Sequence, residues 1–346
     1  MGQHPIMLTM SKRKLSRRQA WRVNKIQEER AKRASRRDVL AEEALGAGEL
    51  GPEQEGLITA HYGTQVAVED ADGVAKRCHI RANLDGLVTG DRVVWCAGDP
   101  TGVIVARLGR HGELRRPDTQ GNLKPVAANI DQIVVVVAPL PEPHANLIDR
   151  YLVASEACNI EPVLVLNKVD LLASDADMAS RINDLLAPYP ELGYRLLRTS
   201  QDEGGLKPLL AALQEKVSVF VGQSGVGKSS IINRLLPGAD LRVGALSEAR
   251  SKGTHTTTTA ELVHLPGGGS LIDSPGIREF GLWHMSRDQV EQGFSDMRPF
   301  LGHCKFRDCR HEQEPNCAIL AAVADGKIRS ERLDSYRRII ASLEES

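Results

Sequence analysis

The sequence predicts a multidomain chain made of a small five-stranded β-barrel, an α/β domain with a parallel sheet, and a short C-terminal module rich in cysteine. Five short β-like runs separated by turns lie within residues 56–110. From about residue 125, continuous apolar runs alternate with helical patterns, and three cysteines gather between residues 304 and 317. A length of 346 residues is sufficient for two or three domains.

Residues 1–55 are predicted to form a basic flexible arm and linker. The formal net charge of the whole chain is −1, yet residues 11–37 contain twelve Lys or Arg residues and two Glu residues, a net charge of +10. The other residues must therefore sum to −11. A tract of this charge density is typical of flexible segments that bind phosphates by releasing counterions, although a solvated tail has a similar composition.

Residues 56–112 are predicted to form the barrel. The runs are short and β-like, and turns are expected near residues 72, 85 and 90. Strands of this length and spacing favour a barrel of the OB type, with an SH3-like barrel as the alternative. Many OB barrels bind oligonucleotides, but a fold alone does not assign a function, and a barrel that is only a structural spacer is the other interpretation.

Residues 113–296 are predicted to form a doubly wound α/β domain. Apolar runs at 130–138, 162–166, 217–221 and 269–273 have the character of buried strands. Helical patterns at 146–158 and 177–187 lie between the first three runs. This alternation is typical of a parallel sheet covered by helices on both faces.

A phosphate-binding loop follows the third run. Its pattern, Gly-x₄-Gly-Lys-Ser, lies between a predicted strand and a predicted helix, which is the context that the motif requires. Backbone N–H groups would surround phosphate oxygens, Lys228 would contact the β- and γ-phosphates, and the Ser229 hydroxyl would bind Mg²⁺. The loop residues predicted to bind nucleotide are Gly222, Gln223, Ser224, Gly225, Val226, Gly227, Lys228, Ser229 and Ser230.

A second motif, Asn-Lys-x-Asp at residues 167–170, selects the base. The Asp170 carboxylate can accept from N1–H and the N2 amino group of guanine, a donor pair that adenine does not offer. Asn167 is expected to lie at the N7 edge of guanine and to link neighbouring loops. The Lys168 stem is expected to cover the plane of the base, and Ser200 is expected in a loop whose N–H groups contact O6 of guanine. The two motifs together predict GTP, and an ATP-using P-loop enzyme is the disfavoured alternative.

Two more segments complete the predicted phosphate and magnesium site. Asp273 ends the fourth run, where an acid can hold Mg²⁺ through water, and the Gly276 N–H is placed to sense a γ-phosphate. In the polar stretch 253–259, Thr257 is the first choice for a Mg²⁺ ligand and Thr258 the second.

The residue that follows Gly276 is Ile277, whose aliphatic side chain cannot orient an attacking water. Intrinsic hydrolysis is therefore expected to be slow unless His255 or a bound partner supplies that contact. The predicted catalytic residues are Lys228, His255 and Thr257.

The order of the motifs is reversed relative to familiar GTPases. The base motif at residues 167–170 precedes the phosphate-binding loop at 222–229, which predicts a circularly permuted domain. Adjacent termini in a compact α/β domain make such a permutation physically possible. The Asp273 segment then lies at the C-terminal edge of the GTPase domain and leads into the last domain.

Residues 297–346 are predicted to form a zinc-binding domain with a C-terminal helix. Three thiols and an imidazole leave no ligand position for water, so the metal would be one structural Zn²⁺ ion held by Cys304, Cys309, His311 and Cys317. His303 is a rival to His311 as the nitrogen ligand. The alternative to a metal site is that these cysteines are only small buried apolar residues, and that role is expected for Cys78, Cys96 and Cys158.

The C-terminal helix is predicted to pack against the zinc module. Its apolar stripe contains Ile328, Leu333, Tyr336, Ile340 and Leu343.

Together these features resemble the bacterial ribosome small-subunit-dependent GTPase A family. The resemblance covers residues from about 56 to 346 and Ser-Lys-x-Lys-Leu-Ser in the arm, and includes His-Thr-Thr-Thr, Asp-Ser-Pro-Gly and Cys-x₄-Cys-x-His-x₅-Cys. It implies a GTP hydrolase that acts as a late assembly factor of the 30S ribosomal subunit, binds 16S rRNA and is stimulated by the subunit. It also implies GTP or GDP, Mg²⁺ and one Zn²⁺ as ligands, and it makes His255 a candidate catalytic residue.

The composition excludes other classes of protein. The sequence has no apolar run of about 18 residues that predicts a membrane span, and no signal-peptide pattern. A cytoplasmic location is therefore expected, and the protein is also expected to be a monomer. The alternative function is a GTP-sensing RNA-binding module whose turnover no partner stimulates.

Overall fold

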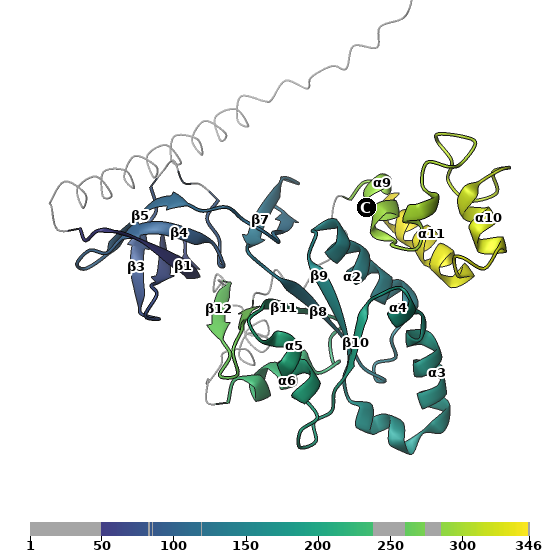
Figure 1. Ribbon diagram of the computed structural model, residues 1–346, viewed down its shortest axis with the longest axis horizontal. Coiled ribbons are helices and arrows are strands. Elements are labelled where there is room, and N and C mark those ends of the chain that lie inside the picture. Colours follow the sequence, from purple (N-terminus) through teal and green to yellow (C-terminus); the bar gives the residue numbers. More distant parts are fainter. Residues whose placement is uncertain are drawn as a thin grey trace, which may run out of the picture.

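The chain folds into a barrel, an α/β domain and a group of C-terminal helices that lie in a row (Figure 1). The computed structural model describes residues 50–81, 84, 86–118, 120–237, 260–273 and 285–344. Most of the predicted arm, residues 1–49, lies outside the described residues.

The barrel is built from β1 (Glu53–Tyr62), β2 (Gln65–Glu69), β3 (Ala75–His79), β4 (Arg92–Cys96) and β5 (Gly102–Arg107). β1 pairs with β2 and β4, and β3 pairs in parallel with β5, so the strand order around the barrel is β1-β2-β3-β5-β4-β1. This closed Greek-key order confirms the OB-type prediction over the SH3-like alternative. β1 begins at Glu53, ahead of the predicted start at residue 56.

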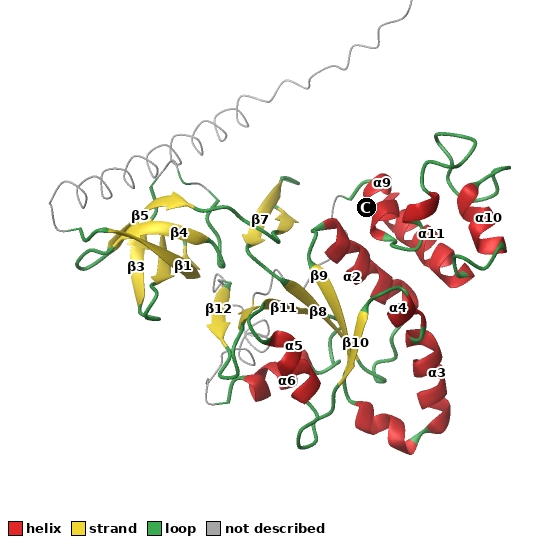
Figure 2. Cartoon of the chain, in the orientation of Figure 1, coloured by secondary structure: helices red, strands yellow, loops and turns green. Residues whose placement is uncertain are grey.

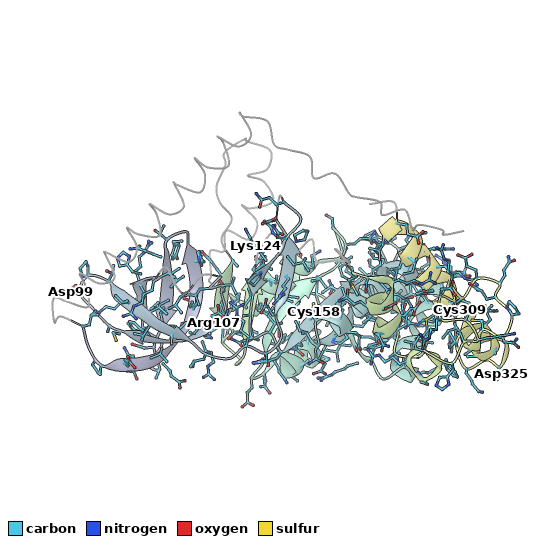
Figure 3. The ribbon with its side chains drawn as sticks, turned by 90° about the horizontal axis from the view of Figure 1, so that it is seen from above. Asp99, Arg107, Lys124, Cys158, Cys309 and Asp325 are labelled. Carbon is cyan, nitrogen blue, oxygen red and sulfur yellow. The ribbon has the colours of Figure 1, made fainter. Side chains whose placement is uncertain are left out.

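A hairpin that the sequence did not predict follows the barrel. It consists of β6 (Leu114–Pro117) and β7 (Leu123–Ala127), and Lys124 projects from its outer part (Figure 3). Its strands are short, carry Arg115, Arg116 and Lys124 on exposed positions, and each contain a proline. They therefore lack the alternation of apolar and polar residues from which a strand is predicted.

The α/β domain has a sheet with the strand order β10-β9-β8-β11-β13-β12. The bounds are β8 Gln132–Val137, β9 Glu161–Leu166, β10 Arg195–Arg198, β11 Val217–Val221, β12 Glu261–His264 and β13 Ser270–Asp273. All neighbours are parallel except β12, which is antiparallel to β13. The four predicted strands are confirmed, whereas β10 and β12 were missed because they are short and carry charged or polar residues.

Helices cover both faces of this sheet, as predicted for a doubly wound domain (Figure 2). They are α2 (Ala145–Ala157), α3 (Ala176–Leu186), α4 (Pro188–Glu191), α5 (Lys207–Leu213) and α6 (Lys228–Leu235), with a short 3-10 helix η1 (Val169–Ser174). Alternate residues of β8 enter different cores: Val135 packs in the core with α2, and Val134 in the core with α5 and α6. α2 and α3 begin one residue before the predicted starts.

The C-terminal part contains α9 (Arg287–Gly293), η3 (Arg298–Phe300), α10 (Ala318–Ala324) and α11 (Ser330–Glu344). The residues of the predicted stripe are buried or half-buried, although Ile328 precedes α11, and the helix packs against α2 and α9 as well as the cysteine-rich loop, where Nη2 of Arg337 donates to the carbonyl of His311 at 2.6 Å. The buried Arg332 forms ion pairs with Asp149 of α2 and, at 2.8 Å, with Asp296. α11 therefore packs against the zinc module, as predicted, and also joins the C-terminal part to the α/β domain.

Candidate functional site

The loop between β11 and α6 has the backbone conformation of a tight glycine-dependent turn. Gly222 has a φ of +137°, and a Cβ there would lie 2.2 Å from the carbonyl oxygen of Val136. Gly227 has a φ of +98°, and a Cβ there would lie 2.4 Å from Nδ2 of Asn167. Both positions therefore require glycine, and the loop passes close to the neighbouring strand and to the base motif.

Lys228 folds back across this loop. Its Nζ donates hydrogen bonds of 2.6 Å each to the carbonyl oxygens of Gly222 and Gln223. The ammonium group is thus held inside the curve of the loop, while Ser224, Gly225, Ser229 and Ser230 are exposed. The first turn of α6 follows directly, so its N–H groups face the same concavity.

Asn167 ties the base motif to the loop. Its side chain is fully buried; Nδ2 donates to the carbonyl of Val226 at 2.9 Å, and Oδ1 accepts from the Thr199 hydroxyl at 3.0 Å. Three loops at the carboxyl edge of the sheet are therefore joined through one amide. Thr199 was not predicted as a separate functional residue, because no local pattern indicates a partner 32 positions away.

Lys168 and Asp170 lie at the same edge of the sheet but differ in their contacts. Lys168 has a φ of +59°, and its Nζ donates to the carbonyls of Gly225 at 2.6 Å and Leu140 at 3.0 Å. The lysine stem therefore spans the space between the base motif and the loop. Asp170 is exposed in η1, and its carboxylate makes no hydrogen bond with another described residue, so it is able to accept from a ligand.

Ser200 lies just after β10, at the end of the same edge. It is 7% exposed, and its backbone N–H points at the carbonyl of Gly205 at 3.4 Å. A Cβ on Gly205 would lie 2.3 Å from the Ser200 hydroxyl, so this loop is tightly folded.

The magnesium side of the site is described in part. Asp273 ends β13, which is parallel to β11, so Asp273 and the loop leave the sheet at the same edge. Ser229 lies on the first turn of α6. The other predicted residues, His255, Thr257, Thr258, Gly276 and Ile277, lie outside the described residues.

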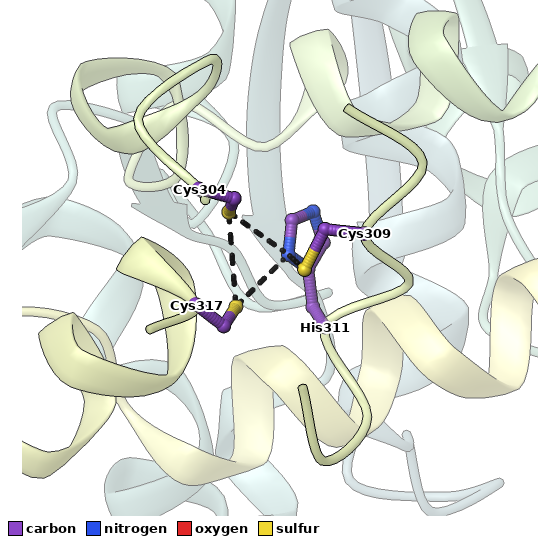
Figure 4. A group of neighbouring side chains, drawn as sticks. All are labelled: Cys304, Cys309, His311 and Cys317. Carbon is purple, nitrogen blue, oxygen red and sulfur yellow. Dashed lines mark hydrogen bonds between the residues drawn. The ribbon is translucent and has the colours of Figure 1, made fainter. Parts of the chain in front are cut away.

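The four predicted metal ligands converge in the C-terminal part (Figure 4). Their ligand atoms, on Cys304, Cys309, His311 and Cys317, all lie within 4.8 Å of one another. The sulfurs of Cys304 and Cys317 are 3.8 Å apart, and Nδ1 of His311 lies 3.6, 3.5 and 3.2 Å from the sulfurs of Cys304, Cys309 and Cys317. Tetrahedral Zn²⁺ bonds of about 2.3 Å to sulfur and 2.0–2.1 Å to nitrogen require spacings of about 3.8 and 3.6 Å. The set fits a closed zinc site.

Glu291 supports this set, and the sequence did not indicate it. Its Oε1 lies 3.4 Å from Nε2 of His311, the ring nitrogen opposite the one that faces the thiols. It also accepts from the Tyr336 hydroxyl at 2.7 Å and from Nε of Arg287 at 3.1 Å. Burial raises the pKa of Glu291, but hydrogen bonds from His311, Tyr336 and Arg287 outweigh it and hold the pKa at about 2. A carboxylate on the second nitrogen is the usual way that a zinc-binding histidine is oriented.

The other thiols behave as predicted for buried apolar residues. Cys78 and Cys96 are buried in the barrel and Cys158 is half-buried on α2's C-terminal end. Burial raises the pKa of Cys78 to about 12 and that of Cys158 to about 11, so neither is a ready thiolate. His303 is exposed and outside the ligand group, so the rival assignment is wrong.

No helix in the described part of the chain is long and apolar enough to cross a membrane.

An OB barrel, a P-loop domain whose base motif precedes its phosphate loop, and a C-terminal Cys₃His cluster define a class of protein: the circularly permuted GTPases with flanking barrel and metal module. The solved structures that are similar to the chain include two circularly permuted relatives. YjeQ from Thermotoga maritima has a TM-score of 0.71 and 31% identity, covering 85% of this chain and 100% of that one. YloQ, described as a circularly permuted GTPase, has a TM-score of 0.68 and 30% identity, covering 85% of this chain and 96% of that one.

Sequence comparison identifies the family within this class. The model of the RsgA GTPase family matches residues 107–283. The small ribosomal subunit biogenesis GTPase RsgA of Azotobacter vinelandii is 61% identical over 342 residues, covering 97% of this chain and 99% of that protein. The protein of the same name from Pseudomonas aeruginosa strain UCBPP-PA14 is 61% identical over 339 residues, with the same coverage. The chain belongs to the RsgA GTPase family and is a GTPase, which contradicts the ATP-using alternative.

Proposed function

We propose that this protein is a cytoplasmic monomer that acts in the biogenesis of the 30S ribosomal subunit, binds 16S rRNA, and hydrolyses GTP when the subunit stimulates it. The observation that carries the proposal is the 61% identity, over 97% of the chain, to GTPases named for small-subunit biogenesis. The matching of the whole chain supports a shared role for the barrel and the metal module as well as for the GTPase domain.

The nucleotide is proposed to lie at the carboxyl edge of the sheet, between the phosphate loop and the base motif. The loop N–H groups and Lys228 bind the phosphates, and the Lys228 ammonium already lies inside the loop, 2.6 Å from the carbonyl oxygens of Gly222 and Gln223. Magnesium, when bound, neutralises charge on the β- and γ-phosphate oxygens. Ser229, Thr257 and, through water, Asp273 would hold it, and the Gly276 N–H would sense the γ-phosphate.

Hydrolysis is proposed to depend on the partner. Ile277 replaces a water-orienting side chain, so the free protein should turn over slowly. His255 is proposed to orient or activate the attacking water once the subunit has bound. A module that senses GTP but is not stimulated is the competing function, and it predicts 30S binding that does not depend on the nucleotide.

Replacing Asp170 with asparagine is expected to change the base that the protein prefers. The introduced amide would place an NH₂ group against the guanine N2 amino group, so affinity for GTP should fall by about 10-fold or more. Xanthosine triphosphate should bind more tightly to Asp170→Asn than to the wild type, because xanthine has a carbonyl at C2 that the amide can donate to. Nucleotide affinities measured by competition against a fluorescent analogue check this.

The control for that substitution is Asp177→Asn, an exposed aspartate on the first turn of α3. It should leave both affinities unchanged. Unaltered GTP affinity in Asp170→Asn would contradict the assignment of the base site.

The barrel is proposed to contribute a stacking surface for rRNA. Tyr62 is 43% exposed at the end of β1, and the guanidinium of Arg77 lies 4.4 Å from its ring centroid. Exposed aromatic rings backed by arginine are typical of single-stranded nucleic acid sites on OB folds. In the metal module, exposed Lys305, Arg307 and Arg310 supply positive charge for phosphate contacts.

Removing the Tyr62 ring is therefore expected to weaken 30S binding. Tyr62→Ala should lower the affinity for 30S subunits by about 10-fold, since base stacking is worth about 1–3 kcal/mol per base. Tyr62→Phe keeps the ring and should bind nearly as the wild type does. Co-sedimentation with purified 30S subunits in a non-hydrolysable GTP analogue measures this, and wild-type binding by Tyr62→Ala would exclude this surface from the interface.

A further inference from the structure

The barrel and the GTPase domain share a continuous line of strand pairing. β1 of the barrel pairs antiparallel with β12 at Ala60 and Glu261, and β12 pairs with β13 so that Glu261 lies opposite Asp273. Ala60, Glu261 and Asp273 therefore stand side by side on three adjacent strands. Figure 1 shows β12 between the barrel and the rest of the sheet. Only one strand separates the barrel from the proposed magnesium residue.

A barrel turn at residues 88–91 makes a second contact with the same strands. The hydroxyl of Thr89, which is 1% exposed, donates to the carbonyl of Ala260 at 2.8 Å, directly before β12. Gly90 has a φ of +92°, and a Cβ there would lie 2.1 Å from the carbonyl oxygen of Ala128 and 3.1 Å from Cδ1 of Ile272. Ile272 immediately precedes Asp273, so the turn packs closely against β13, the strand that carries Asp273.

The turn is held rigidly in that place. Asp91 is fully buried and accepts from Nε and Nη2 of Arg110 at 2.6 and 2.7 Å and from the Val88 N–H at 2.8 Å. From the other side, Nδ2 of Asn129 donates to the carbonyl of Gly90 at 2.8 Å. A turn with this many fixed contacts can impose its position on a four-residue strand such as β12.

We infer that the barrel turn at residues 88–91 positions Asp273, and that Thr89 is the residue through which it acts. The Thr89 hydroxyl fixes the start of β12. Because Glu261 of β12 pairs with Asp273, the position of β12 in turn determines where β13 and Asp273 lie. The inference rests on the proposed role of Asp273 at the magnesium site. It also gives the barrel a defined connection to the nucleotide, by which a ligand bound to the barrel changes how well magnesium is held.

The expected consequence is a change in magnesium dependence. Thr89→Val keeps the shape of the side chain but removes the donor, so the Ala260 carbonyl loses this hydrogen bond and Asp273 is less well placed. Bound Mg²⁺ would neutralise phosphate charge and link the phosphates to the protein, so it should slow the release of GDP. The Mg²⁺ concentration that gives half of this slowing should rise by about 3- to 10-fold, as expected for the loss of one buried hydrogen bond.

The test measures the release rate of a fluorescent GDP analogue from the full chain across a titration of Mg²⁺ and in EDTA. Thr89→Ser restores the hydroxyl and should restore the wild-type midpoint. Thr101→Val makes the same change in the loop between β4 and β5, two positions after Asp99 in the sequence, and should have no effect; Asp99 lies at the far end of the barrel (Figure 3). The release rate in EDTA should be the same in all of these variants.

Asp273→Asn separates this inference from the proposed site. If Asp273→Asn raises the Mg²⁺ midpoint and Thr89→Val does not, the positioning role is wrong while the magnesium site stands. If Thr89→Val instead speeds release in EDTA and lowers the unfolding temperature without moving the midpoint, Thr89 is a packing residue only. If Asp273→Asn leaves the midpoint unchanged, the magnesium assignment fails and the inference with it.

Discussion

Replacing Lys228 with alanine is expected to lower GTP turnover by about 10³-fold, the order of loss seen when one preorganised donor to a transition state is removed. The Lys228 ammonium is held by two loop carbonyls at 2.6 Å, at the point where the phosphates are proposed to lie. The fold should persist, because the loop conformation depends on its glycines. Phosphate release under saturating GTP, with and without 30S subunits, measures the effect.

The matched control is Lys207→Ala, an exposed lysine at the start of α5. It removes the same charge from the α/β domain and should leave turnover within about 2-fold of the wild type, as surface substitutions usually do. Turnover by Lys228→Ala that equals this control would contradict the assignment of the phosphate site.

Loss of one metal ligand is expected to unfold the cysteine-rich loop. Cys317→Ser should reduce bound zinc from one ion per chain to a small fraction, since structural zinc contributes about 10–16 kcal/mol in small zinc domains. The loop at residues 304–317 has few apolar side chains of its own, so the metal is its main support. Metal analysis of the purified protein and amide hydrogen exchange over this loop measure the result.

Cys158→Ser is the control for that substitution, because Cys158 is a half-buried thiol outside the ligand group. It should keep one zinc per chain and normal exchange in the loop. Full zinc content in Cys317→Ser, with unchanged protection of residues 304–317, would contradict the assignment of the metal site.

The parts of the site that the sequence predicted are those whose chemistry requires local spacing. Gly222 and Gly227 have backbone angles that favour glycine, and the phosphate loop must present its N–H groups in one short segment. The cysteine and histidine ligands lie within fourteen positions because a small loop closes around one ion. Such patterns can be read from a single chain.

The residues that were missed act over long sequence distances. Thr199 reaches Asn167, and Glu291 reaches His311 20 positions further along, on the far side of the metal cluster. Neither has a local pattern. The Ser-x-x-Gln capping box at Ser286 and Gln289 does mark the start of α9, so the helix was predictable even though the role of Glu291 was not.

The elements of the fold likewise divide into those that a local sequence pattern predicts and those that depend on distant parts of the chain. The long apolar strand β8 was evident, whereas β12 and the β6–β7 hairpin were not, because their residues are charged or few and their pairing is set by partners far along the chain. The contact of Thr89 with Ala260, 171 positions apart, is of this kind. The joining of barrel and GTPase sheet therefore emerged only from the three-dimensional arrangement.

GTP turnover by the full chain with purified 30S, 50S and 70S particles tests the proposed function most directly. Turnover is expected to be slow for the protein alone, to rise at least about 10-fold with 30S subunits, and to show no comparable rise with 50S subunits, because a partner must supply the contact that Ile277 lacks. Lys228→Ala should stay inert in every mixture. A turnover rate that 30S subunits leave unchanged would contradict subunit-stimulated hydrolysis and favour a module that senses GTP without stimulated turnover.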